Sequence, residues 1–124
     1  MINSLENGDV RIINALPSEI YNGSSKIVFG RKGRIRGSVN VPFVSLHDSN
    51  TGSYLPVDQL RKIFNEVGIA NAKKTITYCG GGIAASNDAF ALALLGYENV
   101  SVYDGSMLEW GNDVSLPMEM DGDI

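Results

Sequence analysis

This chain has a single cysteine, no long apolar run and no start that resembles a leader sequence. Its 124 residues include one cysteine, Cys79, so the chain cannot form an internal disulfide or a zinc site built from several cysteines. No apolar run approaches the roughly 20 residues that a membrane-spanning helix needs. The start, Met-Ile-Asn-Ser-Leu-Glu-Asn, lacks the basic residues and apolar stretch of a signal peptide. We therefore expect a cytoplasmic protein whose lone thiol stays reduced.

Positive charge is also in short supply. The chain has 10 Lys and Arg against 14 Asp and Glu, for a formal net charge of −4. A chain with this balance is not expected to take nucleic acid or an anionic membrane as its main partner. The hydrophobic fraction of 44% excludes a disordered chain, and 124 residues fit one domain. We expect residues 1–124 to form a single domain.

Short strands and helices are predicted to alternate along the chain. Leu60, Ile63, Phe64 and Val67 have the spacing of one apolar helix face. The predicted strands are 10–14, 38–41, 74–78 and 100–103, and the predicted helices are 18–21, 57–67, 84–95 and 106–109. Such alternation is typical of an α/β fold, in which helices cover both faces of a mainly parallel central sheet.

The remaining segments are predicted to be loops or ends. Residues 22–32 are polar and contain glycine, and a second loop, which includes His47, ends at Pro56. We expect residues 119–124 to be a solvated end, and Trp110 to lie in the core. Ser106 begins a Ser-x-x-Glu capping box, which predicts a helix-cap role, with a place on a pocket rim as the alternative.

The position of the glycines gives the first indication of chemistry. Of 14 glycines, three directly follow Cys79, between a predicted strand and a predicted helix. Glycine permits a close-packed turn whose successive N–H groups point into one concavity. The following helix adds unbonded N–H groups and the positive end of its dipole. Residues 80–85 are therefore predicted to stabilise a thiolate, a persulfide or a bound anion at Cys79.

Two other interpretations of Cys79 must be weighed. A lone cysteine at a strand end can be simply a small buried apolar residue. A cysteine phosphatase or arsenate reductase also holds a thiolate in an amide-lined loop, but it needs the spacing Cys-x5-Arg so that the arginine can grip the oxyanion. The sixth residue after Cys79 is Ala85, which disfavours that chemistry.

Three blocks of the chain, in order, resemble the rhodanese (sulfurtransferase) family. Residues 33–42, Gly-Arg-Ile-Arg-Gly-Ser-Val-Asn-Val-Pro, are similar to the family's Gly-His-Ile-Pro-Gly-Ala-Val-Asn-Ile-Pro. Residues 77–85, Thr-Tyr-Cys-Gly-Gly-Gly-Ile-Ala-Ala, resemble its active-site loop, and residues 94–117 resemble its closing segment. The likeness is greatest to the catalytic C-terminal domain of tandem thiosulfate and 3-mercaptopyruvate sulfurtransferases.

This resemblance implies a rhodanese-like three-layer α/β/α domain in which Cys79 is the nucleophile. Cys79 would take a sulfane sulfur from a small anionic donor of the thiosulfate or 3-mercaptopyruvate type, become a persulfide, and pass the sulfur to cyanide, a thiol or a protein thiol. The resemblance implies no metal and no organic cofactor. The backbone N–H groups that would hold the persulfide are those of Gly80, Gly81, Gly82, Ile83, Ala84 and Ala85.

The chain departs from the family pattern in several places. Gly81 and Ala84 replace the Ser and Thr of the mercaptopyruvate-type loop, and Leu16 stands where the family usually has arginine. Arg34 and Arg36 are candidates to steer an anionic donor instead. Little chain precedes the first predicted strand, so we expect either a domain with a shortened start or a piece of a longer protein. The departures also keep open a non-catalytic binding or regulatory module on the same scaffold.

Overall fold

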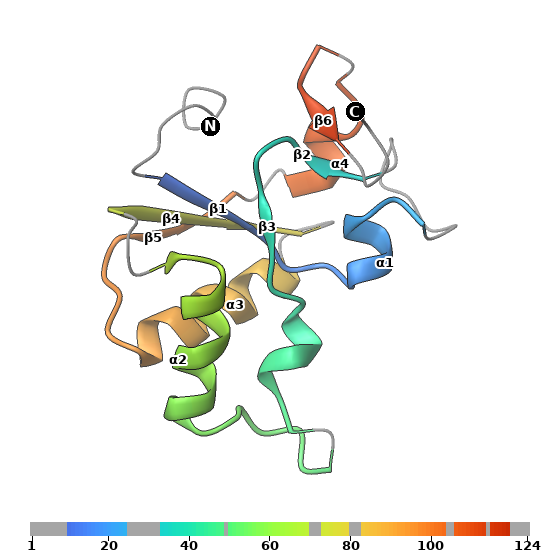
Figure 1. The fold of residues 1–124 in the computed structure, drawn as a ribbon. Helices are drawn as coiled ribbons and strands as arrows, with labels where there is room; N and C mark the ends of the chain where they lie inside the picture. Colours follow the sequence, from blue (N-terminus) through green and yellow to red (C-terminus); the bar gives the residue numbers. More distant parts are fainter. Residues whose placement is uncertain are drawn as a thin grey trace.

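The computed structural model describes residues 10–24, 33–48, 50–69, 73–79, 83–103, 106–113 and 115–119. Its helices and strands alternate over most of the chain, as predicted (Figure 1). In chain order they are β1 (Val10–Asn14), α1 (Ser18–Tyr21), β2 (Arg34–Ile35), β3 (Val39–Asn40), the 3-10 helix η2 (Phe43–Leu46), α2 (Val57–Glu66), β4 (Lys74–Tyr78), α3 (Ile83–Leu94), β5 (Val100–Val102), α4 (Ser106–Trp110) and β6 (Met118–Glu119).

The central sheet is parallel throughout. Its strand order is β3-β1-β4-β5. β1 and β4 form the longest pairing, from Val10 opposite Lys74 to Asn14 opposite Tyr78. Because parallel strands end at the same edge, the residue that follows β4 lies where ligands bind in folds of this kind. The predicted mainly parallel sheet is confirmed.

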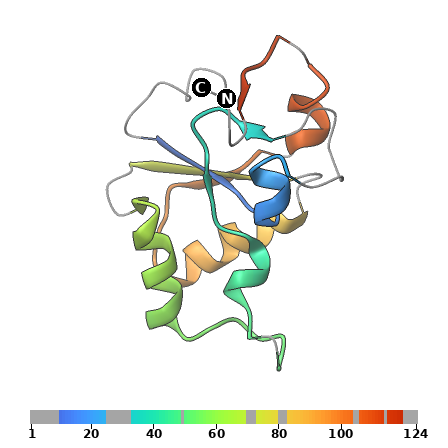
Figure 2. The same ribbon diagram turned by 45° about the vertical axis from the view of Figure 1, so that its right-hand side comes forward.

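Two apolar cores lie on opposite faces of this sheet. Successive residues of a strand point to opposite faces, and on β1 Ile12 belongs to one core while Ile13 belongs to the other. The Ile12 core includes residues of α4 and β2, and α1 packs against it; the Ile13 core includes residues of α2 and α3. Figures 1 and 2 show α2 and α3 on one side of the sheet and α1, α4 and the β2–β6 pair on the other. The structure therefore has the predicted three layers.

Local sequence signals explain the two longer helices. α2 begins after Pro56, buries Leu60 and Phe64, and is followed by Gly68, whose positive φ of 79° is a conformation that glycine adopts easily. α3 is rich in alanine and buries Ala85 and other small or aliphatic side chains against the sheet. Both helices lie within a residue or so of the predicted bounds.

Three short elements were not predicted. The antiparallel pair β2–β6 and the helix η2 are each too short to show a hydrophobic period. The prediction of a solvated end from residue 119 is wrong for Glu119, which lies in β6 opposite Arg34. Residues 120–124, and residues 25–32 of the first predicted loop, lie outside the described part of the chain. None of the described helices is long and apolar enough to cross a bilayer.

Candidate active site

Cys79 directly follows β4 at the carboxyl edge of the parallel sheet. Its side chain is only 2% exposed and belongs to the core that also contains Ala85, Met107 and Trp110. The cysteine is therefore buried, with apolar residues of α3 and α4 in the same core.

α3 begins four residues after the cysteine. As the first residues of this helix, Ile83, Ala84 and Ala85 carry N–H groups that helical bonding leaves available, at the positive end of the helix dipole. The Thr77 hydroxyl donates a hydrogen bond of 2.9 Å to the Ala85 carbonyl, which ties the first turn of α3 to β4. The rest of the predicted anion-binding loop, Gly80–Gly82, lies outside the described residues, so its role stays a prediction.

The main chain of Cys79 is held by the start of α4. Its N–H donates to the Ser106 hydroxyl at 3.1 Å, and its carbonyl accepts from the Met107 N–H at 2.8 Å. The Ser106 hydroxyl also donates to the Tyr103 carbonyl at 2.7 Å, while the Glu109 carboxylate accepts from the Tyr103 hydroxyl. The two side chains of the predicted capping box therefore bond to other groups, although the predicted helix is present.

Tyr78, the residue before the cysteine, is fixed by its hydroxyl. That oxygen lies 3.0 Å from both Asn14 Nδ2 and the Ile35 N–H, which donate to it, and 2.8 Å from Ser38 Oγ. Because Ser38 donates its own proton to the Ile35 carbonyl, it accepts the proton of Tyr78. Burial raises the pKa of Tyr78 to about 12, so the hydroxyl keeps its proton at neutral pH. Residues from β1, β2 and the turn before β3 thus hold the strand that carries Cys79.

Leu16, the departure from the family's usual arginine, lies in the same core as Cys79. Its N–H donates to Asn14 Oδ1 at 2.8 Å. The Asn40 amide donates to the carbonyls of Asn14 and Leu16 at 3.0 and 2.9 Å. This segment is therefore fixed by amide groups rather than by an arginine, and it adds no positive charge to the site.

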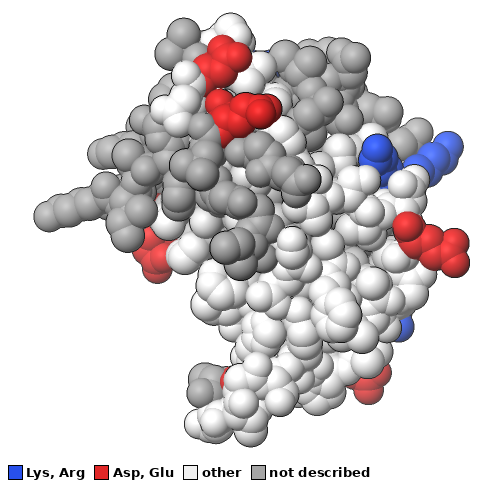
Figure 3. Space-filling view, turned by 180° about the vertical axis from the view of Figure 1, so that it is seen from behind, with Lys and Arg blue, Asp and Glu red and all other residues white. Residues whose placement is uncertain are grey.

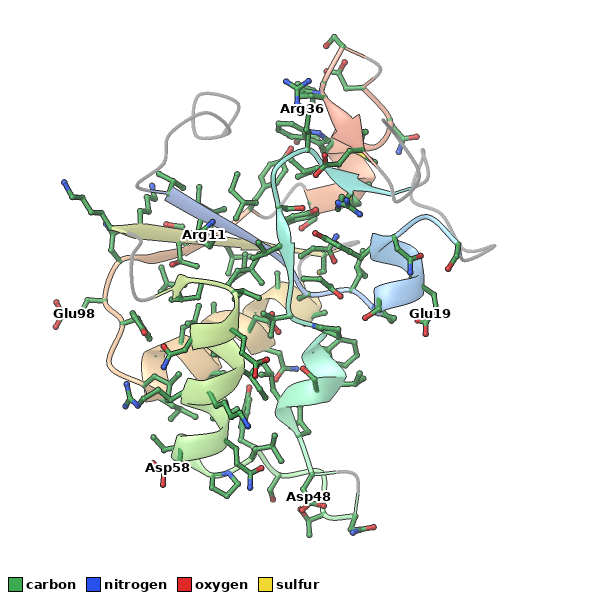
Figure 4. The ribbon with its side chains drawn as sticks, viewed as in Figure 1. Arg11, Glu19, Arg36, Asp48, Asp58 and Glu98 are labelled. Carbon is green, nitrogen blue, oxygen red and sulfur yellow. The ribbon has the colours of Figure 1, made fainter. Side chains whose placement is uncertain are left out.

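The two predicted steering arginines have different surroundings. Arg34 lies 3.2 Å from Glu119, donates to the Tyr21 carbonyl at 3.3 Å and stacks over the Tyr21 ring. These contacts give Arg34 a structural role in joining β2 to β6 and α1. Arg36 is exposed, and Figure 4 shows it beside β6. Steering of an anionic donor stays a prediction for both residues.

A second polar cluster surrounds His47, the only histidine in the sequence. Its Nε2 and Nδ1 lie 3.1 Å from Asn87 Oδ1 and the Gly52 carbonyl, and its ring stacks on Tyr54 with centroids 4.3 Å apart. This side chain joins the second loop to α3. The cluster borders a hollow of about 440 Å³, lined by Phe43, Val44, His47, Asp48, Gly52 and Asn87.

Asp88 on α3 is a buried carboxyl that sequence reasoning did not single out. Its side chain is fully buried, and neither oxygen accepts a hydrogen bond within the described part of the chain. Burial raises the pKa of Asp88 to about 9, so it is protonated at neutral pH. The one available signal was an acidic residue on the buried face of an alanine- and leucine-rich helix.

Charged side chains lie mainly around the margin of the face seen from behind. Figure 3 shows that the described residues at the centre of this face are largely uncharged. α3 contributes no exposed charge, because Asp88 is its only charged residue. Among the described residues, no three His, Cys, Asp or Glu side chains lie close enough together to hold a metal ion.

Curated relatives match roughly three quarters of the chain. A protein of Mycobacterium tuberculosis strain H37Rv, provisionally named a thiosulfate sulfurtransferase, is 40% identical over 91 residues, which cover 73% of this chain and 32% of the relative. A provisionally named thiosulfate sulfurtransferase of Haloferax volcanii is 42% identical over 90 residues, covering 72% and 31%. The 3-mercaptopyruvate sulfurtransferase of Escherichia coli K12 is 39% identical over 89 residues, also covering 72% and 31%. The match thus spans about a third of the length of these relatives.

Solved structures of similar shape cover more of the chain. EanB with ergothioneine covalently linked to a cysteine persulfide superposes with a TM-score of 0.86 and 26% identity over 95% of this chain and 30% of that protein. The anaerobic ergothioneine biosynthesis enzyme from Chlorobium limicola, bound to trimethyl histidine, gives a TM-score of 0.83 and 25% identity over 95% and 30%.

The family pattern itself extends over most of the sequence. Residues 1–113 match the rhodanese-like domain family. The match includes the parallel sheet, the strand that ends at Cys79, and the helix that follows it. It also includes the α4 segment that holds the cysteine's main chain. By sequence match and by architecture, this chain belongs to the rhodanese-like domain family.

Proposed function

We propose that this chain is a sulfurtransferase domain in which Cys79 carries a sulfane sulfur from a small anionic donor to a nucleophilic acceptor. The observation that carries the proposal is the position of the only thiol in the chain. It stands between the carboxyl end of a central parallel strand and the first turn of α3, in a member of the rhodanese-like family.

The first half-reaction forms a persulfide. The Cys79 thiolate attacks the outer sulfur of thiosulfate, the S–S bond of the donor breaks, and sulfite leaves with the bonding electron pair. With 3-mercaptopyruvate the C–S bond breaks instead, and the departing pyruvate enolate takes up a proton. In both cases the cysteine keeps one added sulfur and the negative charge moves to that outer sulfur.

The second half-reaction removes the added sulfur from Cys79. A thiolate acceptor attacks the outer sulfur, the S–S bond of the persulfide breaks, and the Cys79 thiolate is regenerated. Cyanide takes the same sulfur to give thiocyanate. Since the donor product leaves before the acceptor reacts, the kinetics are ping-pong.

The first turn of α3 stabilises the charge in both half-reactions. The N–H groups of Ile83, Ala84 and Ala85 belong to the positive end of a 12-residue helix. Donors fixed in place before the reaction need no reorganisation when charge develops, which is why such groups lower barriers. The predicted loop at Gly80–Gly82 adds its amides to the same set. The chain needs no charged side chain in contact with the sulfur for this chemistry.

The names of the relatives and the side chains that this site lacks support the proposed class of donor. The names of the relatives point to thiosulfate and 3-mercaptopyruvate. Leu16 supplies no charge, and Gly81 and Ala84 supply no hydroxyl, so these three positions offer either donor main-chain groups only. Because similar solved structures hold ergothioneine and trimethyl histidine, imidazole compounds belong among the acceptors tested.

The decisive experiment is a donor screen read by intact mass. The full chain is incubated with thiosulfate or 3-mercaptopyruvate, and we expect an added mass of roughly 32 Da, one sulfur atom, on Cys79. Adding a thiol or cyanide should remove that mass, and Cys79→Ser should never acquire it. No added sulfur with any donor, or an adduct that persists in Cys79→Ser, would refute the proposal.

A non-catalytic binding module on the same scaffold is the second candidate. The burial of Cys79, which leaves its side chain 2% exposed, favours it. In such a module the thiol stays inert towards sulfur donors and towards iodoacetamide until the protein unfolds. The mass screen therefore separates the two candidates. Phosphatase turnover on an aryl phosphate is expected to be absent, because Ala85 occupies the position of the required arginine.

A further inference from the structure

Two consecutive residues of α4 hold both main-chain polar groups of Cys79. The Ser106 hydroxyl accepts from the cysteine N–H at 3.1 Å, and the Met107 N–H donates to the cysteine carbonyl at 2.8 Å. We call this pair of contacts the α4 clamp. Cys79 and Ser106 are 27 residues apart in sequence, so the clamp exists only in the folded protein.

The α4 clamp lies directly beyond the last hydrogen bonds that β4 makes within the sheet. On one side of β4, the last ladder bond runs from the Ala15 N–H to the Tyr78 carbonyl at 2.9 Å. On the other side it runs from the Tyr103 N–H to the Thr77 carbonyl at 2.9 Å. Cys79 lies beyond both, with its main chain buried. The α4 clamp therefore replaces the missing ladder and orients the residue that carries the thiol.

The Ser106 hydroxyl is committed to this role by its surroundings. It donates its only proton to the Tyr103 carbonyl at 2.7 Å, which leaves its oxygen as an acceptor facing Cys79. The side chain is fully buried. An aliphatic side chain at this position would remove the acceptor that Ser106 provides to the Cys79 N–H.

Ser106 also has a strained backbone conformation, which supports a functional role. Ser106 has a φ of 48°, the one positive value among the described residues that are not glycine. Glycine would adopt this conformation with less strain. A strained residue whose side chain completes a buried contact is a candidate for function rather than for stability alone.

We propose that Ser106 is a positioning residue for sulfur transfer, acting through the main chain of Cys79 to aim its thiol at the first turn of α3. The proposal rests on the proposed function, since it assigns how the reactive sulfur is held. Small displacements of a reacting group slow the chemical step strongly while leaving ligand binding nearly unchanged. Loss of the Ser106 hydroxyl should therefore lower kcat more than it raises the donor KM.

Two variants separate the hydroxyl from the backbone strain. Ser106→Ala removes the hydroxyl and keeps the strain, whereas Ser106→Gly removes both. We expect each to lower the rate of Cys79 persulfide formation about tenfold to a hundredfold, with donor KM changed less than about twofold. The two should differ in thermal stability, Ser106→Gly being the more stable, because glycine relieves the strain. The rate of persulfide formation is thus expected to depend on the hydroxyl, and the thermal stability on the backbone strain.

One further variant serves as the control. Ser101→Ala, on an exposed position of β5, should behave as the unmodified chain in both rate and stability. If Ser106→Gly formed the persulfide at the unmodified rate, or if its loss of rate appeared only as a raised donor KM, the positioning role would be overturned.

Failure of the proposed function can be told apart from failure of this inference. An unmodified chain that accepts sulfur while Ser106→Gly matches it overturns the inference alone. An unmodified chain that accepts no sulfur overturns the proposed function, and the clamp is then tested by iodoacetamide. A rate of Cys79 alkylation that changes in Ser106→Gly by more than its measured change in the unfolding equilibrium explains, with Ser101→Ala unchanged, supports the clamp, whereas rates that follow the unfolding equilibrium in all three proteins overturn it.

Discussion

At the scale of single residues, the position of the thiol depends on hydrogen bonds with residues that lie far away in sequence. Tyr78 is held by residues of β1 and of the turn around β2, and Cys79 is held by Ser106. Each of the hydroxyl oxygens involved has its donors and acceptors matched, so none can be replaced by an apolar group without leaving a buried polar group unbonded. Hydrogen bonds to distant residues therefore constrain Tyr78 and Cys79, the two residues at the β4 terminus.

Tyr78→Phe tests this matching. The substitution leaves Asn14 Nδ2 and the Ile35 N–H without their acceptor in a buried site, so we expect a loss of about 1–3 kcal/mol in the free energy of unfolding. Urea denaturation measures it. Tyr97→Phe is the control, because Tyr97 is only partly buried. An equal, small effect of both substitutions would show that the Tyr78 hydroxyl contributes little.

Asp88 should make stability depend on pH in an unusual direction. Its pKa is about 9 in the folded chain and about 3.9 in an unfolded one. Between these values the folded state keeps a proton that the unfolded state has released, so the free energy of unfolding falls as pH rises from about 4 to about 9. Below about pH 4 the group adds no slope.

Asp88→Asn isolates this effect. The amide is neutral at every pH, so the downward slope between pH 5 and pH 8 should be reduced relative to the unmodified chain. Urea midpoints at several pH values measure it, and Asp58→Asn on the exposed face of α2 is the matched control. Parallel slopes for the unmodified chain and Asp88→Asn would mean that Asp88 is ionised in the folded protein.

At the scale of elements, prediction from sequence succeeds where a pattern is long enough to repeat. β1, β4, α2 and α3 were predicted because apolar residues recur in them with a clear period or run between evident end signals. β2 and β6 could not be predicted, because two residues have no period and the Arg34–Glu119 partners are 85 residues apart. The candidate active site likewise has one part that the sequence predicts and one that it does not.

The predictable part of the site is its local part. Cys79 and the first turn of α3 follow from one stretch of strand, glycine and helix signals. The α4 clamp does not, because it depends on β4 and β5 ending at the same edge and on the turn that brings Ser106 back. A Ser-x-x-Glu pattern predicts a helix start, but it cannot say which distant N–H the serine will accept.

The β2–β6 pair offers a test at this scale. Glu119 accepts from Arg34 at 3.2 Å and from the Gly37 N–H at 3.0 Å. Because Glu119 is partly exposed, we expect Glu119→Ala to lower the free energy of unfolding by no more than about 1 kcal/mol. Chemical denaturation measures the change, with Glu98→Ala on an exposed loop as the control. A much larger loss would mean that the pair supports the core beneath it.

At the scale of the whole molecule, net charge and local charge act in opposite directions on an anionic donor. The formal charge of −4 repels thiosulfate, whereas an exposed arginine that steers the donor would attract it. Arg34 is joined to Glu119, which offsets its charge. Arg36 is the exposed member of the predicted steering pair, so a test of steering begins with it.

The dependence of rate on salt tells which charge dominates. If Arg36 steers the donor, the second-order rate constant of persulfide formation from thiosulfate falls as salt rises, because screening within about 10 Å removes a local attraction. Arg36→Ala should then lower this rate constant at low salt by about twofold to tenfold and flatten the salt dependence. Arg61→Ala makes the same change in net charge from an exposed position on α2, behind the opposite face of the sheet, and should leave the dependence intact. A rate constant that rises with salt in every variant would mean that repulsion by the whole acidic molecule outweighs Arg36, because screening then helps the donor to approach.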